Sequence, residues 1–122
     1  MKPPRFLSLA EKLVLLKLIN QLDIQTRNNI SCDIECATVT EENSDGSILR
    51  FHISGYNRPK YEGQREYPVE GRVFDTDGEL LTVCIYADQN NRLYELELIR
   101  YADGDVMKPD WNTFEIYKTS LR

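Results

Sequence analysis

Residues 74–101 read FDTDGELLTVCIYADQNNRLYELELIRY, and this stretch decides the fold class. Its segments are rich in Leu, Val, Ile and Tyr and alternate with turn residues, a pattern typical of β-strands. The Asp77-Gly78 pair indicates a tight hairpin turn, and residues 88–91 supply a second turn. We therefore expect strands over 67–74, 80–87 and 93–101 that form an antiparallel meander.

The chain on either side of this meander indicates further strands. Residues 33–41 and 47–54 alternate in polarity on either side of a turn at 43–46, which predicts a hairpin. Residues 55–64 contain two glycines and a proline, so we expect an irregular surface loop there. Residues 113–117 are expected to add a short strand or a turn of helix.

The N-terminal segment has the period of a helix instead. Ser8 and Glu11 have the spacing of a capping box, so a helix is expected to begin at Leu9. Apolar residues then recur at three- and four-residue intervals as far as Leu22 or Asp23, and residues 25–29 are expected to form a loop. The predicted fold class is α+β, with one N-terminal helix packed on a twisted antiparallel sheet of about five strands, in a single domain over residues 1–122.

Composition predicts a soluble, cytoplasmic protein. The chain has 122 residues, of which 41% are hydrophobic and 29% charged, as in ordinary globular domains. The first apolar stretch is interrupted by Glu11, Lys12 and Lys17, so neither a signal peptide nor a membrane span is expected. The three cysteines, Cys32, Cys36 and Cys84, are in contexts that read as strands, which favours reduced, buried thiols over disulfides.

Charge is distributed unevenly along the chain. Residues 75–105 carry a net charge of −6, whereas the whole chain carries −5 and residues 1–30 carry +3. A concentrated negative field suits a basic protein partner and disfavours nucleic acid. We therefore expect a basic protein as partner, with no nucleic acid and no membrane; the oligomeric state stays open.

No motif of a known reaction is present. His52 is the only histidine, the Cys32–Cys36 spacing is wrong for a zinc ribbon, and the glycine at 78 comes too early for a calcium-binding loop that starts at Asp75. Paired carboxylates such as Glu95 and Glu97 are a weak signal for acid–base catalysis. We predict no enzyme activity, no catalytic residues, no cofactor and no metal.

The strand over 93–98 contains the most prominent of these carboxylates. Alternation puts Tyr94 on the face of Leu96 and Leu98, and puts Glu95 and Glu97 together on the opposite, solvent face. The simpler interpretation is that the two glutamates only keep the strand soluble. Aromatic residues near an acidic surface suit a protein interface, although for Trp111 the stronger expectation is that it seals the base of the sheet.

Two runs, 74–81 and 93–104, followed by Pro109 and Trp111, resemble a family of small, uncharacterised acidic bacterial proteins. In size and charge the chain is similar to immunity proteins of polymorphic-toxin systems, including contact-dependent growth inhibition. This resemblance implies an immunity protein, or antitoxin, that binds and neutralises a cognate basic toxin domain, expected to be a nuclease, by occluding its active site. Alternatives are a non-inhibitory adaptor that uses the 55–64 loop and a free sheet edge, and a small ligand-binding protein.

The resemblance assigns no residue roles, so the predicted partner contacts rest on charge and expected exposure. They are Glu95, Glu97, Asp103, Asp105, Asp75, Asp77, Tyr94 and Trp111.

Overall fold

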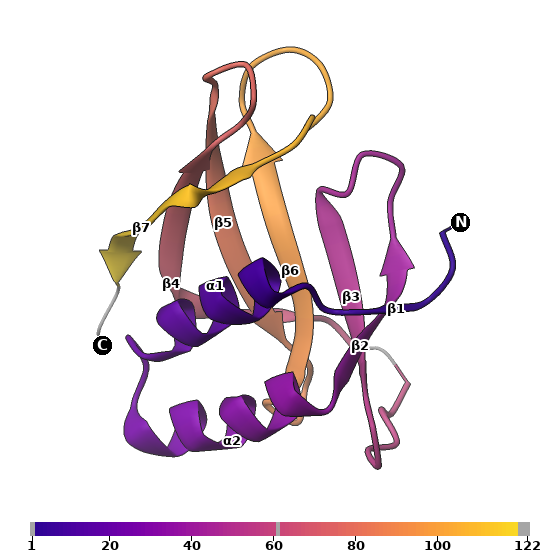
Figure 1. Ribbon diagram of the computed structural model, residues 1–122. Helices are drawn as coiled ribbons and strands as arrows, with labels where there is room; N and C mark the ends of the chain where they lie inside the picture. Colours follow the sequence, from indigo (N-terminus) through magenta and orange to yellow (C-terminus); the bar gives the residue numbers. More distant parts are fainter. Residues whose placement is uncertain (1, 61, 120–122) are drawn as a thin grey trace.

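The computed structural model describes residues 2–60 and 62–119. This part of the chain forms one antiparallel sheet of seven strands. It also forms two helices, which lie over one face of the sheet (Figure 1). Neither helix is long and apolar enough to cross a membrane. In chain order the elements are β1 (Arg5–Phe6), α1 (Leu9–Ile19), α2 (Ile24–Glu35), β2 (Ala37–Glu42), β3 (Ile48–Ile53), β4 (Arg65–Phe74), β5 (Leu80–Ala87), β6 (Leu93–Arg100) and β7 (Asp110–Thr119).

The prediction of one helix on about five strands is wrong. The sheet has the order β1-β2-β3-β6-β5-β4-β7. Its two edge strands, β1 and β7, account for the difference in the number of strands. Strand β1 is two residues long, too short to leave a periodic pattern. Strand β7 is ten residues long, where only a short strand or a helical turn over 113–117 was expected, and it pairs with β4 across two irregularities that obscure its alternation.

The start of α1 is confirmed. The Ser8 hydroxyl accepts from the Glu11 amide at 3.1 Å, and the Glu11 carboxylate accepts from the Ser8 amide at 2.8 Å, which completes the capping box. The helix ends at Ile19, before the expected end at Leu22 or Asp23. Glu11 is also held by Arg5 of β1 at 2.8 Å, so the cap joins the first strand to the helix.

The loop predicted over 25–29 is wrong, because these residues belong to α2. Asp23 caps this helix by accepting from the Thr26 amide at 2.9 Å. Only a narrow stripe of the helix is apolar and buried, formed by Ile30 and Ile34 at the i, i+4 spacing, so the helical period is weak in the sequence. As a result the following strand begins at Ala37 instead of Asp33.

The second helix also changes the environment of the cysteines. Cys32 lies in α2 and Cys36 caps its C-terminus, and both are exposed. The prediction of buried strand thiols is therefore wrong for these two residues. It is confirmed for Cys84, which lies in β5 and is 1% exposed.

The meander β4–β5–β6 and the hairpin β2–β3 are confirmed, and β3 pairs with β6 to join them. In β5, Leu81, Val83 and Ile85 are fully buried beneath the helices. Their neighbours in sequence, such as Leu80 and Thr82, lie on the opposite face, which we call the open face. Gly71 of β4 has no side chain where the Phe114 ring lies, and a Cβ there would overlap that ring.

Candidate functional site

The predicted contact residues fall into separate places. Four of them lie at one end of the sheet, which we call the loop end: the β4–β5 turn (75–79) and the β6–β7 loop (101–109), next to each other at the top of Figure 1. These four are Asp75, Asp77, Asp103 and Asp105. The other four lie within strands, with Tyr94, Glu95 and Glu97 in β6 and Trp111 in β7.

Asp75 faces the interior of the loop end. It is 3% exposed, and its carboxylate accepts from the backbone amides of Thr76, Met107 and Lys108 at 2.8–2.9 Å. Arg100 donates to the same carboxylate at 3.1 Å. Burial raises the pKa of Asp75, but the backbone N–H donors outweigh it, so this pKa lies below its usual value. The carboxylate therefore stays ionised and holds the β6–β7 loop onto the β4–β5 turn.

Arg100 completes this arrangement, which we call the Arg100 clamp. Its side chain is 7% exposed and donates two hydrogen bonds to Asp77, at 3.0 and 2.7 Å. The bonds from Arg100 lower the pKa of Asp77. Arg100 also donates to the backbone carbonyl of Asp103 at 3.1 and 3.2 Å. Arg100 thus binds both Asp75 and Asp77, which leaves one net negative charge in the group, and the clamp fixes the shape of the loop end.

Glu95 and Glu97 share one face of the sheet, as expected, but the expectation that Glu95 faces solvent is wrong. Glu95 is 3% exposed and accepts from Arg50 at 3.0 Å and from Gln64 at 3.4 Å. Glu97 is half-buried and accepts from the Tyr86 hydroxyl at 2.7 Å. Burial, together with this hydrogen bond, raises the pKa of Tyr86 well above its usual value. Both glutamates lie on the open face, but each is engaged by a neighbouring side chain.

The two predicted aromatic contacts have internal partners. Tyr86 pairs with Glu95 and Ala87 with Leu93, so Tyr94 is the extra residue of a β-bulge. The guanidinium groups of Arg50 and Arg58 lie 5.7 and 5.0 Å from its ring centroid. Trp111 is half-buried and packs against the hydrophobic core, as its alternative interpretation expected.

Three carboxylates of the loop end do face solvent. The side chains of Glu79, Asp103 and Asp105 are exposed, and no ion pair among the described residues includes them. Large apolar side chains lie in the same region: Phe74 is 47% exposed, Leu80 40% and Tyr101 76%. Sequence reasoning missed Glu79 and these three apolar residues, although the Asp77-Gly78 turn fixes the register that places Phe74 opposite Leu80.

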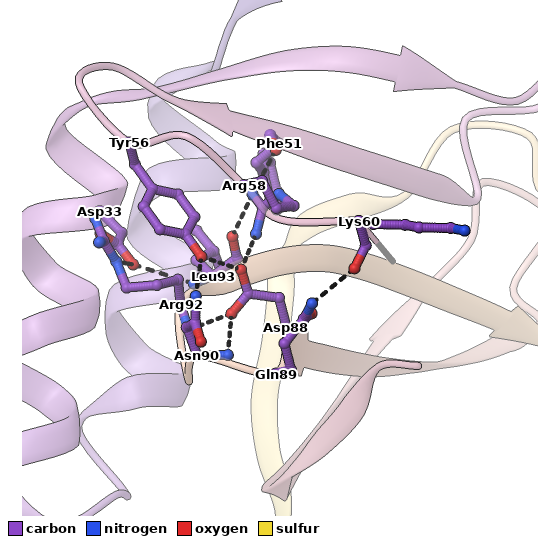
Figure 2. A network of polar contacts seen from close by, with 10 residues as sticks. All are labelled: Asp33, Phe51, Tyr56, Arg58, Lys60, Asp88, Gln89, Asn90, Arg92 and Leu93. Atoms are coloured by element: carbon purple, nitrogen blue, oxygen red, sulfur yellow. Dashed lines mark hydrogen bonds and ion pairs between the residues drawn. The ribbon is translucent and has the colours of Figure 1, made fainter. Parts of the chain in front are cut away.

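A second polar cluster lies at the opposite end of the sheet, around Asp88 of the β5–β6 turn. Figure 2 shows the Asp88 carboxylate between the hydroxyl of Tyr56, at 2.6 Å, and the guanidinium of Arg58, at 2.8 Å. Its other oxygen accepts from the amides of Asn90 and Arg92 at 2.9 and 3.0 Å. Burial raises the pKa of Asp88, but these hydrogen bonds outweigh it, so the pKa is lowered.

Asp33 of α2 extends this cluster. It is 2% exposed and accepts from the Arg92 guanidinium at 2.6 Å and from the Leu93 amide at 3.0 Å (Figure 2). A general base needs a carboxylate within reach of a substrate proton, whereas Asp33 and Asp88 already accept from several protein donors. This cluster therefore joins α2, the loop after β3 and the β5–β6 turn.

A third group of titratable side chains lies on the open face. The potential ligand atoms of Glu66, Glu70 and Cys84 lie within 4.8 Å of one another. Burial, with the neighbouring carboxylates, raises the pKa of the Cys84 thiol to about 12. The Cys84 thiol and the Glu66 and Glu70 carboxylates thus lie together on the open face, with Glu66 exposed.

A small cavity of about 230 Å³ lies between the N-terminal segment, the sheet and Trp111. Leu96 and Leu98 contribute apolar surface to it, and Arg5 and Glu11 contribute charges that are already paired with each other. The volume is below the range of roughly 300–1,000 Å³ that is usual for ligand pockets. Two more open hollows, of about 420 and 550 Å³, lie at the β2–β3 hairpin and beside Trp111, so cavity volume leaves the ligand-binding alternative open.

Comparison with known proteins shows the family of this chain but does not indicate its function. No curated protein and no solved structure matches the chain. A family model does match, over residues 4–109, which include both loops of the loop end and stop just before β7. Because this match covers most of the chain, the protein belongs to the family described as Domain of unknown function (DUF6984).

Proposed function

We propose that the chain is an immunity protein that binds and neutralises a basic toxin domain, expected to be a nuclease. One observation carries the proposal: Glu79, Asp103 and Asp105 are exposed at the loop end, without ion pairs among the described residues, beside exposed apolar side chains. Charged residues around an apolar centre are typical of protein interfaces. The net charge of −5 adds a long-range attraction for a cationic partner.

The proposed contacts differ from those expected from sequence. Asp75 and Asp77 both bind Arg100, and Glu95 is paired with Arg50, so these three carboxylates support the fold. Asp103 and Asp105 keep their predicted role, and Glu79 joins them. The electrostatic contact therefore involves fewer anions than the net charge of residues 75–105 indicated.

The mechanism we propose is occlusion of the toxin's active site. A nuclease binds phosphate through lysine and arginine side chains, and carboxylates held close together offer those cations an alternative anion. The Arg100 clamp holds the loop that bears Asp103 and Asp105, so little conformational freedom is lost on binding. The chain would then exclude the nucleic acid from the active site without any chemistry of its own.

A co-expression experiment tests this proposal. The proposal requires a toxin domain encoded in the native host, and that domain is expressed with the wild-type chain or with the Asp103→Lys/Asp105→Lys variant. We expect growth to be protected by the wild type and lost with the variant, and association of the purified proteins to slow and to lose its salt sensitivity.

A matched control changes the net charge equally at another place. Glu35 and Glu62 are exposed outside the loop end, and the Glu35→Lys/Glu62→Lys variant should still protect. Protection by the loop-end variant as well would show that this surface does not make the contact. Tight binding of a host protein without neutralisation of any toxin would identify an adaptor instead.

A further inference from the structure

Three exposed apolar side chains form a row across the open face at the loop end. Phe74 of β4 pairs with Leu80 of β5. Leu81 pairs with Arg100, the last residue of β6, so Leu80 lies on the opposite face from Leu81. Continuing the alternation of β6 by one residue places Tyr101 beside Leu80 on that face. We call Phe74, Leu80 and Tyr101 the apolar row. It lies on the face that the helices leave uncovered.

The next pairs along the strands extend this surface. Arg72 pairs with Thr82, and Thr82 pairs with Ile99, and all three side chains are partly exposed. Ile99 therefore extends the apolar row into an apolar band, with Thr82 and with Arg72, which is ion-paired with Glu115, beside it. Contiguous exposed apolar surface of this kind on a small domain marks an interaction site more often than single exposed residues do.

Carboxylates lie on both sides of this band. Toward the tips of the loops are Glu79, Asp103 and Asp105, which are exposed. Toward the middle of the sheet, Glu70 and Glu97 both pair with Cys84, which is the next residue of β5 after Thr82 on the open face. A matching partner must present large apolar side chains flanked on both sides by lysine or arginine. An anionic membrane or a nucleic acid would meet repulsion from these groups.

The loop end is also preorganised. The Arg100 clamp joins its two loops, and the Thr76 hydroxyl donates to the Lys108 carbonyl at 2.6 Å. A surface held in this way loses little conformational entropy when a partner binds. Phe74 and Leu80 extend from strands, which further limits the conformational freedom of their side chains.

We propose that the apolar row is the central contact of a docking surface for an amphipathic basic segment of a partner protein, in which large apolar side chains are flanked on both sides by lysine or arginine. This inference rests on the proposed function only in taking the partner to be a basic protein; the partner need not be a toxin. Phe74, Leu80 and Tyr101 supply the buried contact, and the surrounding carboxylates align the segment.

The test uses the full chain labelled with ¹⁵N and a defined probe, a synthetic amphipathic peptide of lysine, leucine and tryptophan. We expect amide shifts to change at Phe74, Leu80, Tyr101 and the two loops. The Leu80→Ser/Tyr101→Ser variant should bind the peptide at least about tenfold more weakly. Its matched control is Leu9→Ser/Leu13→Ser, which removes exposed apolar side chains from α1 and should leave the affinity unchanged.

Several outcomes would overturn the inference. Oligolysine of equal length binding as tightly as the amphipathic peptide would show that charge alone acts. Shift changes centred away from the loop end would place the site elsewhere. A dimer in sedimentation experiments that the Leu80→Ser/Tyr101→Ser variant abolishes would show that a second copy covers the row. Peptide binding at the row without toxin neutralisation would refute the immunity function alone, so the two proposals fail separately.

Discussion

The Arg100 guanidinium lies 3.1 Å from the Asp75 carboxylate, and the two side chains are 7% and 0% exposed. This buried pair joins the end of β6 to the β4–β5 turn. Both groups have further partners, because Asp75 accepts from three backbone amides and Arg100 reaches Asp77 and the Asp103 carbonyl. A buried charge without these bonds would be costly, so the arrangement of both loops depends on the pair.

The first prediction concerns Asp75. Asp75→Asn removes the charge that faces Arg100 and turns an amide NH₂ toward backbone donors, so we expect a loss of about 3 kcal/mol in unfolding free energy. Urea unfolding measures it. The control Asp105→Asn changes an exposed carboxylate and should stay within about 0.5 kcal/mol of wild type. Equal stability of the two variants would contradict the clamp.

The second prediction is a loss of stability in acid. Burial raises the pKa values of Asp75, Asp88 and Glu11, but hydrogen bonds outweigh burial and leave all three below their usual values. The folded chain then binds fewer protons than the unfolded chain, whose carboxyl pKa values are about 4. The stabilisation is complete above that value and is lost as pH falls through the lowered pKa values.

Unfolding free energies measured between about pH 5 and pH 3 check this acid dependence. Asp75→Asn should lose less stability over that interval than the wild type, because one of the contributing carboxylates is gone. An identical slope in both proteins would show that Asp75 has an ordinary pKa in the folded chain.

The third prediction concerns Tyr67, which is 4% exposed and whose hydroxyl has no hydrogen-bond partner among the described residues. Tyr67→Phe removes that unpaired group, so stability should stay equal or rise by up to about 1 kcal/mol. Tyr56→Phe is the contrasting variant, because it removes the 2.6 Å bond to Asp88 and should cost about 1.5–3 kcal/mol. Thermal unfolding of both variants measures these changes in stability. A marked loss of stability in Tyr67→Phe would reveal a hydrogen bond of the Tyr67 hydroxyl.

The fourth prediction concerns the thiols. Cys32 and Cys36 are exposed, whereas Cys84 is buried and its pKa is raised to about 12. Iodoacetamide at about pH 8 should therefore alkylate Cys32 and Cys36 in the native chain and Cys84 only after unfolding. Peptide mass spectrometry locates the modified residues. Rapid native alkylation of Cys84 would mean that β5 is accessible from the open face.

Local signals in the sequence were sufficient for part of the fold. The Ser8–Glu11 capping box and the Asp77-Gly78 turn act over a few residues, and both formed as expected. The helix α2 was missed because its buried stripe is only Ile30 and Ile34. Strand β1 was missed because two residues carry no period, and it forms only by pairing with β2.

The site was less accessible to sequence reasoning, for a physical reason. Charge along the chain is visible in the sequence, but its neutralisation depends on contacts between distant residues, such as Glu95 with Arg50 and Asp33 with Arg92. The bulge at Tyr94 breaks the alternation in a strand that reads as regular. Asp103 and Asp105 stay exposed because they lie in a loop where no arginine pairs with their side chains among the described residues.

The β6–β7 loop takes part in the Arg100 clamp through its backbone groups. Met107 and Lys108 reach Asp75 through their backbone N–H groups, and Asp103 offers Arg100 its carbonyl oxygen. Every residue except proline supplies the same N–H, and every residue supplies the same carbonyl. Mutation can therefore exchange the side chains at 103, 105 and 107 while the scaffold beneath them persists, so descendants of this chain can acquire new specificities one substitution at a time.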